Sequence, residues 1–169
     1  MLATKEAGTT YLDLTERYPI ISSRGNQYIF IFCDYETNSI QATLIKTRNA
    51  AEIQDATMPM LSTLTTSGNK PNIHILDNDV SSSLKQGFLK NNIKYQLVPL
   101  HPPRKNATKC EIQTSKAYFI TCLCAVNPQY PTKEWDSFLP QETLNLNILR
   151  KYRFNPKLSS HAALHGIFD

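Results

Sequence analysis

A run of six apolar residues, Tyr28-Ile-Phe-Ile-Phe-Cys33, has the length and the β-branched and aromatic composition of a β-strand. Because the run holds no charged residue, we expect a central strand that is buried on both faces of a sheet. The sequence also predicts a strand from Thr9 to Leu14. Across a polar turn after Tyr28–Cys33, it predicts a strand from Ile40 to Ile45 that pairs antiparallel with Tyr28–Cys33. These three strands are predicted to form a meander.

Helical and strand patterns alternate in the next part of the chain. Ala50 to Thr66 has apolar residues at helical spacing, although Pro59 should kink this helix or divide it into two pieces. Three further elements are predicted after it: a strand from Ile73 to Leu76, a helix from Ser81 to Lys90 and a strand from Tyr95 to Val98. Strands that alternate with helices pair in parallel through right-handed crossovers.

The last part of the sequence is predicted to be mainly helical. Pro99 to Lys105 contains three prolines and should form an irregular loop. Helical spacing of apolar residues then extends from Ala107 to Val126 and from Trp135 to about Tyr152, and a short basic tail follows from Arg153. The sequence therefore predicts an α/β fold with a five-stranded mixed sheet, three antiparallel strands followed by two parallel ones, flanked by helices.

Length and charge limit the class of protein. A chain of 169 residues, 41% of them hydrophobic, can bury one sizeable core and should form one domain. The net charge of +4 permits an acidic partner such as nucleic acid. Between Val80 and Lys133 the only acid is Glu111, against eight bases: Lys85, Lys90, Lys94, Arg104, Lys105, Lys109, Lys116 and Lys133. Either a solvated basic face or a surface that contacts phosphates would explain this surplus.

Other features of the sequence exclude several classes. Cys33, Cys110, Cys122 and Cys124 lack the spacing of metal ligands, so we expect reduced thiols. The first residues are polar and carry both charge signs, unlike a signal peptide. No apolar run approaches the roughly 20 residues of a membrane span. We therefore expect a soluble, intracellular protein without a membrane partner.

Two aspartates occur near the ends of predicted strands. Asp13 lies in the first strand and Asp77 directly follows the fourth. If the fourth strand lies parallel beside the first, both carboxylates meet in a cleft at the strand ends. Such carboxylates suit Mg²⁺, and paired ions can drive an in-line phosphoryl displacement. Alternatively, Asp13 is an edge acid, and Asp77 caps or turns the chain into the next helix.

Several short motifs occur in a particular order along the chain. They are Tyr11-Leu-Asp13-Leu, the strand that closes with Asp34-Tyr35, Leu76-Asp77-Asn78, Tyr95-Gln-Leu-Val-Pro99, Arg104-Lys-Asn-Ala107 after the proline-rich loop, and Asn155-Pro-Lys-Leu158. The first five, in this order, resemble the catalytic cores of copia-type retrotransposon integrases, over most of the chain from about Tyr11 to Arg150. The last resembles the stretch that follows this core in related elements.

The resemblance implies an RNase H-like three-layer fold. It assigns residues 1–126 to the integrase catalytic core and residues 127–169 to a C-terminal helical extension and basic tail of the same domain. It also implies a polynucleotidyl transferase that carries out DNA integration with Mg²⁺ or Mn²⁺, with Asp13 and Asp77 as catalytic metal ligands.

The sequence departs from the family at the third acidic position, which Lys109 occupies. A unit positive charge 4 Å from a dication is repelled by roughly 8 kcal/mol at an effective dielectric constant of 20. We therefore expect metal binding to be weak or lost, and the protein to be catalytically inactive or severely impaired. Glu111 is two residues further on, about 200° around a helix, so we do not expect it to take over as a ligand.

The resemblance also implies partners and a location. DNA, both element ends and target, is the expected partner, and Arg104, Lys105, Lys109 and Lys116 are the expected contacts to its phosphates. The family implies a homo-oligomer and nuclear action. The chain lacks the His/Cys zinc module of the family, so we expect it to be a piece of a larger polyprotein. Two alternatives stay open: a non-catalytic RNase H-like DNA-binding or interaction module, and a degenerate element fragment without a selected function.

Four other residues receive structural interpretations. We expect Asp34 to serve a turn or support the site rather than bind metal, and Asp79 to cap the helix that begins at Ser81. His74, between two isoleucines, is expected to be a hydrogen-bonded strand histidine. Trp135 and the apolar residues that follow it are spaced as on one face of a helix. We therefore expect Trp135 to lie in the core or an interface rather than stack on bases.

Overall fold

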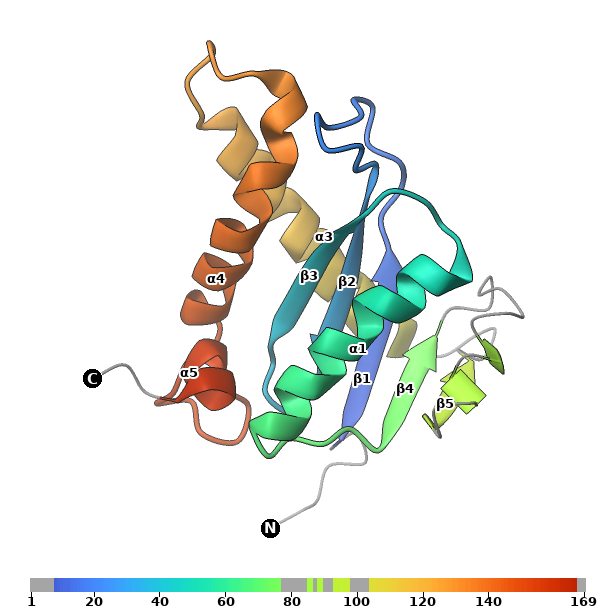
Figure 1. Ribbon diagram of the computed structural model, residues 1–169. Helices are drawn as coiled ribbons and strands as arrows, with labels where there is room; N and C mark the ends of the chain where they lie inside the picture. Colours follow the sequence, from blue (N-terminus) through green and yellow to red (C-terminus); the bar gives the residue numbers. More distant parts are fainter. Residues whose placement is uncertain (1–7, 77–84, 87, 90–92, 98–103, 167–169) are drawn as a thin grey trace.

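The computed structural model describes residues 8–76, 85, 86, 88, 89, 93–97 and 104–166, with only the backbone described for 104–109. A five-stranded sheet forms its middle layer (Figure 1). The strands are β1 (Thr9–Leu14), β2 (Tyr28–Asp34), β3 (Ile40–Ile45), β4 (Ile73–Leu76) and β5 (Tyr95–Leu97), in the order β3-β2-β1-β4-β5. This arrangement confirms the predicted fold class.

Strand pairing follows the predicted scheme. β1 pairs antiparallel with β2, where Tyr11 lies opposite Cys33, and β2 pairs antiparallel with β3. β1 pairs in parallel with β4, where Tyr11 lies opposite Ile75, and β4 pairs in parallel with β5. β2 is buried along nearly its whole length, as its uninterrupted apolar sequence predicts.

Helices cover both faces of the sheet (Figure 1). One face carries α1 (Ala50–Thr66), and the other carries α3 (Arg104–Cys124) and α4 (Leu139–Leu149). A 3-10 helix, η1 (Thr132–Phe138), leads into α4, and α5 (Ser160–His165) packs beside α4.

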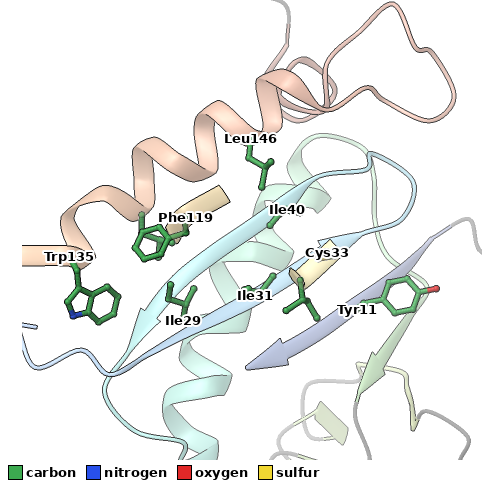
Figure 2. Close-up of a cluster of buried hydrophobic side chains, with 10 residues drawn as sticks. Tyr11, Ile29, Ile31, Cys33, Ile40, Phe119, Trp135 and Leu146 are labelled. Atoms are coloured by element: carbon green, nitrogen blue, oxygen red, sulfur yellow. The ribbon is translucent and has the colours of Figure 1, made fainter. Parts of the chain in front are cut away.

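Alternate residues of β2 point to two separate cores. On the α3 face, Ile29, Ile31 and Cys33 pack with Phe119 and Trp135 (Figure 2). On the α1 face, the intervening phenylalanines pack with apolar residues of α1, β4 and α5: Met60, Leu64, Leu76 and Leu164. Each such fully buried side chain contributes about 1.5–3 kcal/mol of hydrophobic stabilisation. Trp135 is buried in this first core, which confirms that it does not form a base-stacking surface.

Several predicted helix boundaries are wrong. α1 continues through Pro59 as one helix of 17 residues rather than two pieces. An internal proline costs about 3 kcal/mol, and burial of Met60 and Leu64 against the sheet offsets this cost. α3 begins at Arg104, so Arg104 and Lys105 are helical rather than part of the irregular loop.

The C-terminal part also differs from the prediction. The continuous helix expected from Trp135 is a 3-10 helix followed by α4, because Pro140 occupies the first turn of α4, where proline is favoured. The predicted polar tail contains α5, capped by Ser159, whose side chain accepts a hydrogen bond from the backbone of Ala162 at 3.0 Å. Leu164 of this helix is buried, so the tail contributes to the core.

Some predictions lie wholly or largely outside the described residues. They concern most of the helix from Ser81 to Lys90, the end of the strand at Val98, most of the loop from Pro99, and the roles of Asp77 and Asp79. Within the predicted helix, the described residues Lys85, Gln86, Phe88 and Leu89 are helical.

Candidate functional site

Asp13 lies near the end of the central strand β1, as predicted. Its side chain is on the same face of β1 as Tyr11, which packs in the core beneath α3, since side chains alternate along a strand. Asp13 is half-buried, and its Oδ1 accepts a hydrogen bond from the backbone N–H of Leu14 at 2.7 Å. A half-buried carboxylate at the end of a central strand is well placed for chemistry at this edge.

Asp77 immediately follows β4, the strand beside β1, but lies outside the described residues. β4 ends at Leu76, which is buried in the core on the α1 face. Ile75 packs at the margin of the core on the α3 face. The structure therefore describes the strand that leads to Asp77 and its pairing with β1, and the predicted meeting of the two carboxylates lies outside the described residues.

Residue 109 lies in the second turn of α3. Ile112, Ser115 and Phe119 of this helix are buried and form the stripe that faces the sheet. Residue 109 is three positions before Ile112, so its backbone extends the stripe by about one turn. Of the predicted DNA contacts, Lys116 is half-buried on α3, and the side chains of residues 104, 105 and 109 are outside the description.

Glu111 is engaged in a cluster of charged residues that the sequence did not predict. Its carboxylate forms an ion pair with Arg150 and a second with Arg153, at 3.3 Å. The Arg153 guanidinium lies over the ring of Tyr35, 4.3 Å from its centroid. These partners are about 40 residues away or more in sequence, and no local pattern links them. In this cluster both arginines bind the Glu111 carboxylate.

Asp34 is a turn residue, as predicted. Its Oδ2 accepts hydrogen bonds from the backbone N–H of Thr37 at 2.8 Å and from the hydroxyl of the same residue at 2.7 Å. Burial raises the pKa of Asp34 to about 6, an effect that these hydrogen bonds oppose. Burial also raises the pKa of the neighbouring Cys33 thiol to about 12, so this thiol is a core residue rather than a nucleophile.

His74 is confirmed as a hydrogen-bonded strand histidine. Its Nδ1 lies 2.5 Å from the hydroxyl oxygen of Thr10 on the adjacent strand, and its ring stacks near that of Phe88. Burial lowers the pKa of His74 to about 4, so the imidazole is neutral at physiological pH.

Three further findings concern the cysteines, metal clusters and membrane spans of the described residues. All four cysteines are free thiols, as expected. In the described ranges, no cluster of three or more histidine, cysteine, aspartate or glutamate side chains could hold a metal ion. Within the part of the chain that the structure describes, no helix combines the length and apolar character of a membrane span.

Comparisons with known proteins relate the chain to integrases by fold. No family model and no curated protein matches the sequence. The catalytic core of BIV integrase superposes with a TM-score of 0.67 at 10% identity, covering 94% of this chain and 93% of that one. The HTLV-2 integrase catalytic core in complex with magnesium, in a trimeric form, has a TM-score of 0.66 at 16% identity, covering 93% and 95%.

A third neighbour comes from a larger assembly. In the simian T-cell lymphotropic virus intasome with the PP2A regulatory subunit B56 gamma, the matching chain has a TM-score of 0.69 at 15% identity. The match covers 93% of this chain and 54% of that one, so this protein spans about half the length of that neighbour. At these identities the similarity shows the fold alone: the chain has an α/β fold like that of the retroviral integrase catalytic cores.

Proposed function

We propose that this chain is the catalytic-core domain of a retroelement integrase, of copia type, in which the two-metal site is incomplete. The integrase-core fold supports this proposal, and so does the order of the motifs around Asp13, Asp77 and Arg104–Ala107. Residues 1–126 would form the core and residues 127–169 its helical extension.

The register between β1 and β4 carries the proposal. Tyr11 lies opposite Ile75 in this parallel pair. If the pairing continues for two residues, Asp13 faces Asp77 across neighbouring strands, which are about 4.8 Å apart. Because side chains alternate along strands, both carboxylates would then lie on the face covered by α3. That is the geometry required of two ligands for one metal ion.

Lys109 makes the site a poor fit for metal. A complete two-metal site needs oxygen donors, and a lysine ammonium donates hydrogen bonds but has no lone pair for a cation. By helical spacing, the backbone of residue 109 lies about one turn before Ile112 in the stripe of α3 that faces the sheet. Glu111 is held by Arg150 and Arg153 and would have to break both ion pairs to reach the site. We therefore expect catalysis to be severely impaired.

Non-catalytic DNA binding is the second candidate function, and the charge distribution favours it. The segment from Val80 to Lys133 carries eight bases and one acid, and Lys94 and Lys133 within it are exposed. In this interpretation, Arg104, Lys105, Lys109 and Lys116 bind DNA phosphates, and Lys109 contributes attraction where a carboxylate would repel. We also propose a homo-oligomer and nuclear action, as in integrases, of which the HTLV-2 core occurs in dimeric and trimeric forms.

An end-joining assay tests the catalytic part of the proposal. The full chain, with Mg²⁺ or Mn²⁺, is assayed for 3′-end processing and strand transfer on duplexes with the ends of the parent element. We expect background activity for the natural sequence, a gain of activity in Lys109→Glu, and loss of that gain when Asp77→Ala is added. Robust activity of the natural sequence that depends on Asp77 would refute the proposed impairment, and an inactive Lys109→Glu variant would refute the role given to this position.

A further inference from the structure

Two histidines of α5 lie side by side. His161 and His165 are four residues apart, a spacing that puts two side chains on one face of a helix. Their ring centroids are 4.6 Å apart and their ring planes are inclined by 42°. We propose that this pair binds a divalent transition-metal ion with affinity for imidazole, such as Zn²⁺, Ni²⁺ or Cu²⁺.

The separation of the rings fits a shared ion. Metal–imidazole nitrogen bonds are about 2.1 Å long. With the ring centre about 1.1 Å behind the nitrogen, two imidazoles have centroids about 4.5 Å apart at a right angle around one ion and about 5.2 Å apart at a tetrahedral angle, so the observed separation is nearer to the right angle. The Nδ1 atom of His161 is shielded from solvent, so Nε2 is the nitrogen of this ring that would bind the ion.

The helix that carries the pair is fixed at both ends. At its start, the backbone N–H of Ser160 donates to the carbonyl of Arg150 at 2.8 Å, and the Ser160 hydroxyl donates to the carbonyl of Asn38 at 3.1 Å. Near its end, Leu164 is buried in the core on the α1 face. Because this short helix is held in place, the two rings lose little additional conformational entropy when they share an ion.

Space and donor chemistry define the class of ion. Both histidines line an open cavity of about 440 Å³ between α1, β3, α4 and α5, from which water can reach a bound ion. No third histidine, cysteine or carboxylate in the described part of the chain joins them. Water would complete the coordination shell, and the affinity would be lower than at sites with three or four protein ligands. Nitrogen donors select against Mg²⁺, which prefers oxygen, so this site is independent of the proposed integrase function.

Metal titration of the full chain tests the inference. Zn²⁺ binding is measured by calorimetry for the natural sequence, for His161→Asn and His165→Asn, and for His101→Asn as a matched histidine control outside the described residues. We expect saturable binding that falls by about tenfold or more in both α5 variants, since even the loss of a residue that only supports a metal ligand costs that much. The control should retain the affinity of the natural sequence, and excess Mg²⁺ should not compete.

Electron paramagnetic resonance with Cu²⁺ provides a readout that a structural role of these histidines would not produce. The spectrum of the natural sequence should show coupling to two nitrogen ligands, reduced to one in His165→Asn. His165 is exposed, so this variant should fold with an unchanged thermal midpoint in the absence of metal. Unchanged Zn²⁺ affinity in His165→Asn, loss of binding in His101→Asn, or displacement by Mg²⁺ would each overturn the inference.

Discussion

Glu111 of α3 and Arg150, the residue that follows α4, form an ion pair that joins the two helices on the α3 face of the sheet. Arg150 also donates hydrogen bonds to Asn38 in the turn between β2 and β3, from Nε to the backbone carbonyl at 2.7 Å and from a terminal nitrogen to Oδ1 at 2.6 Å. One guanidinium therefore connects α3, α4 and the sheet. This arrangement gives Glu111 a structural role.

Removal of the Glu111 carboxylate should therefore destabilise the fold. In Glu111→Gln, Arg150 loses its charged partner in a mostly buried position, and we expect the free energy of unfolding to fall by about 1–3 kcal/mol. Urea denaturation measures the change, with the exposed Glu16→Gln as a control that should stay within about 0.5 kcal/mol. Equal stability of the two variants would show that the ion pair contributes nothing. Activity of the Lys109→Glu variant should persist when Glu111→Gln is added.

Glu142 should make stability fall as pH rises. It is 2% exposed, its Oε1 has no hydrogen-bond partner among the described residues, and burial raises its pKa to about 7. The folded state therefore holds this proton more tightly than the unfolded state, whose glutamate pKa is about 4.3. The stabilising contribution is complete below that value and is lost as pH rises through about 7, by up to about 4 kcal/mol.

The variant Glu142→Gln isolates this effect, because it cannot ionise. Urea denaturation at several pH values should show that the natural sequence loses stability relative to Glu142→Gln between about pH 4.5 and pH 7. A difference that does not change with pH would mean that Glu142 is not titrated differently in the folded chain.

His74 and Thr10 should produce the opposite pH dependence. Burial lowers the pKa of His74 to about 4, so the stabilising contribution of the neutral ring is complete above the unfolded pKa near 6.5 and is lost as pH falls toward 4.

Thr10→Val keeps the shape of residue 10 but leaves Nδ1 of His74 without the hydroxyl. We expect a loss of about 1–3 kcal/mol at neutral pH, measured by chemical denaturation. An unchanged stability would show that the Thr10 hydroxyl does not stabilise the buried ring.

Lys116 should contribute to DNA binding through charge alone. In Lys116→Glu we expect weaker binding to any duplex sequence. The slope of log affinity against log salt concentration should fall in magnitude by about 1, the contribution of one phosphate contact. Fluorescence anisotropy over a range of salt concentrations measures both. Lys157→Glu makes the same charge change on the C-terminal segment and should leave the slope nearly unchanged. If the two variants behave alike, binding depends on total charge and not on a surface around α3.

The sequence was sufficient for elements whose signal is local. The bounds of β1, β3, β4 and α1 agree with the predicted ranges because alternating or helical apolar patterns lie within each segment. The parallel pairing of β4 and β5 was predicted from the alternation of strands and helices, whereas the place of β4 beside β1 was only assumed. For the site, the sequence predicted that Asp13 lies in the first strand, near its end.

Other features depend on contacts that no local pattern records. The short helix α5 has only six residues, and its stability comes from the burial of Leu164 and from hydrogen bonds to Asn38 and Arg150. The Glu111 ion pairs join residues about 40 positions apart, and an exposed-looking glutamate on a helix does not reveal its partners. The proximity of His161 and His165 could have been noticed from their spacing, but a helix there was not predicted.

Metal binding by a restored site tests the central claim most directly. Mn²⁺ affinity is measured by electron paramagnetic resonance in a His165→Asn background, so that the α5 pair does not contribute. We predict weak or no saturable binding with Lys109 present, clear binding in Lys109→Glu, and its loss when either Asp13→Asn or Asp77→Asn is added. Equal Mn²⁺ affinity with lysine and with glutamate at position 109, or restored binding that survives removal of both aspartates, would contradict the account.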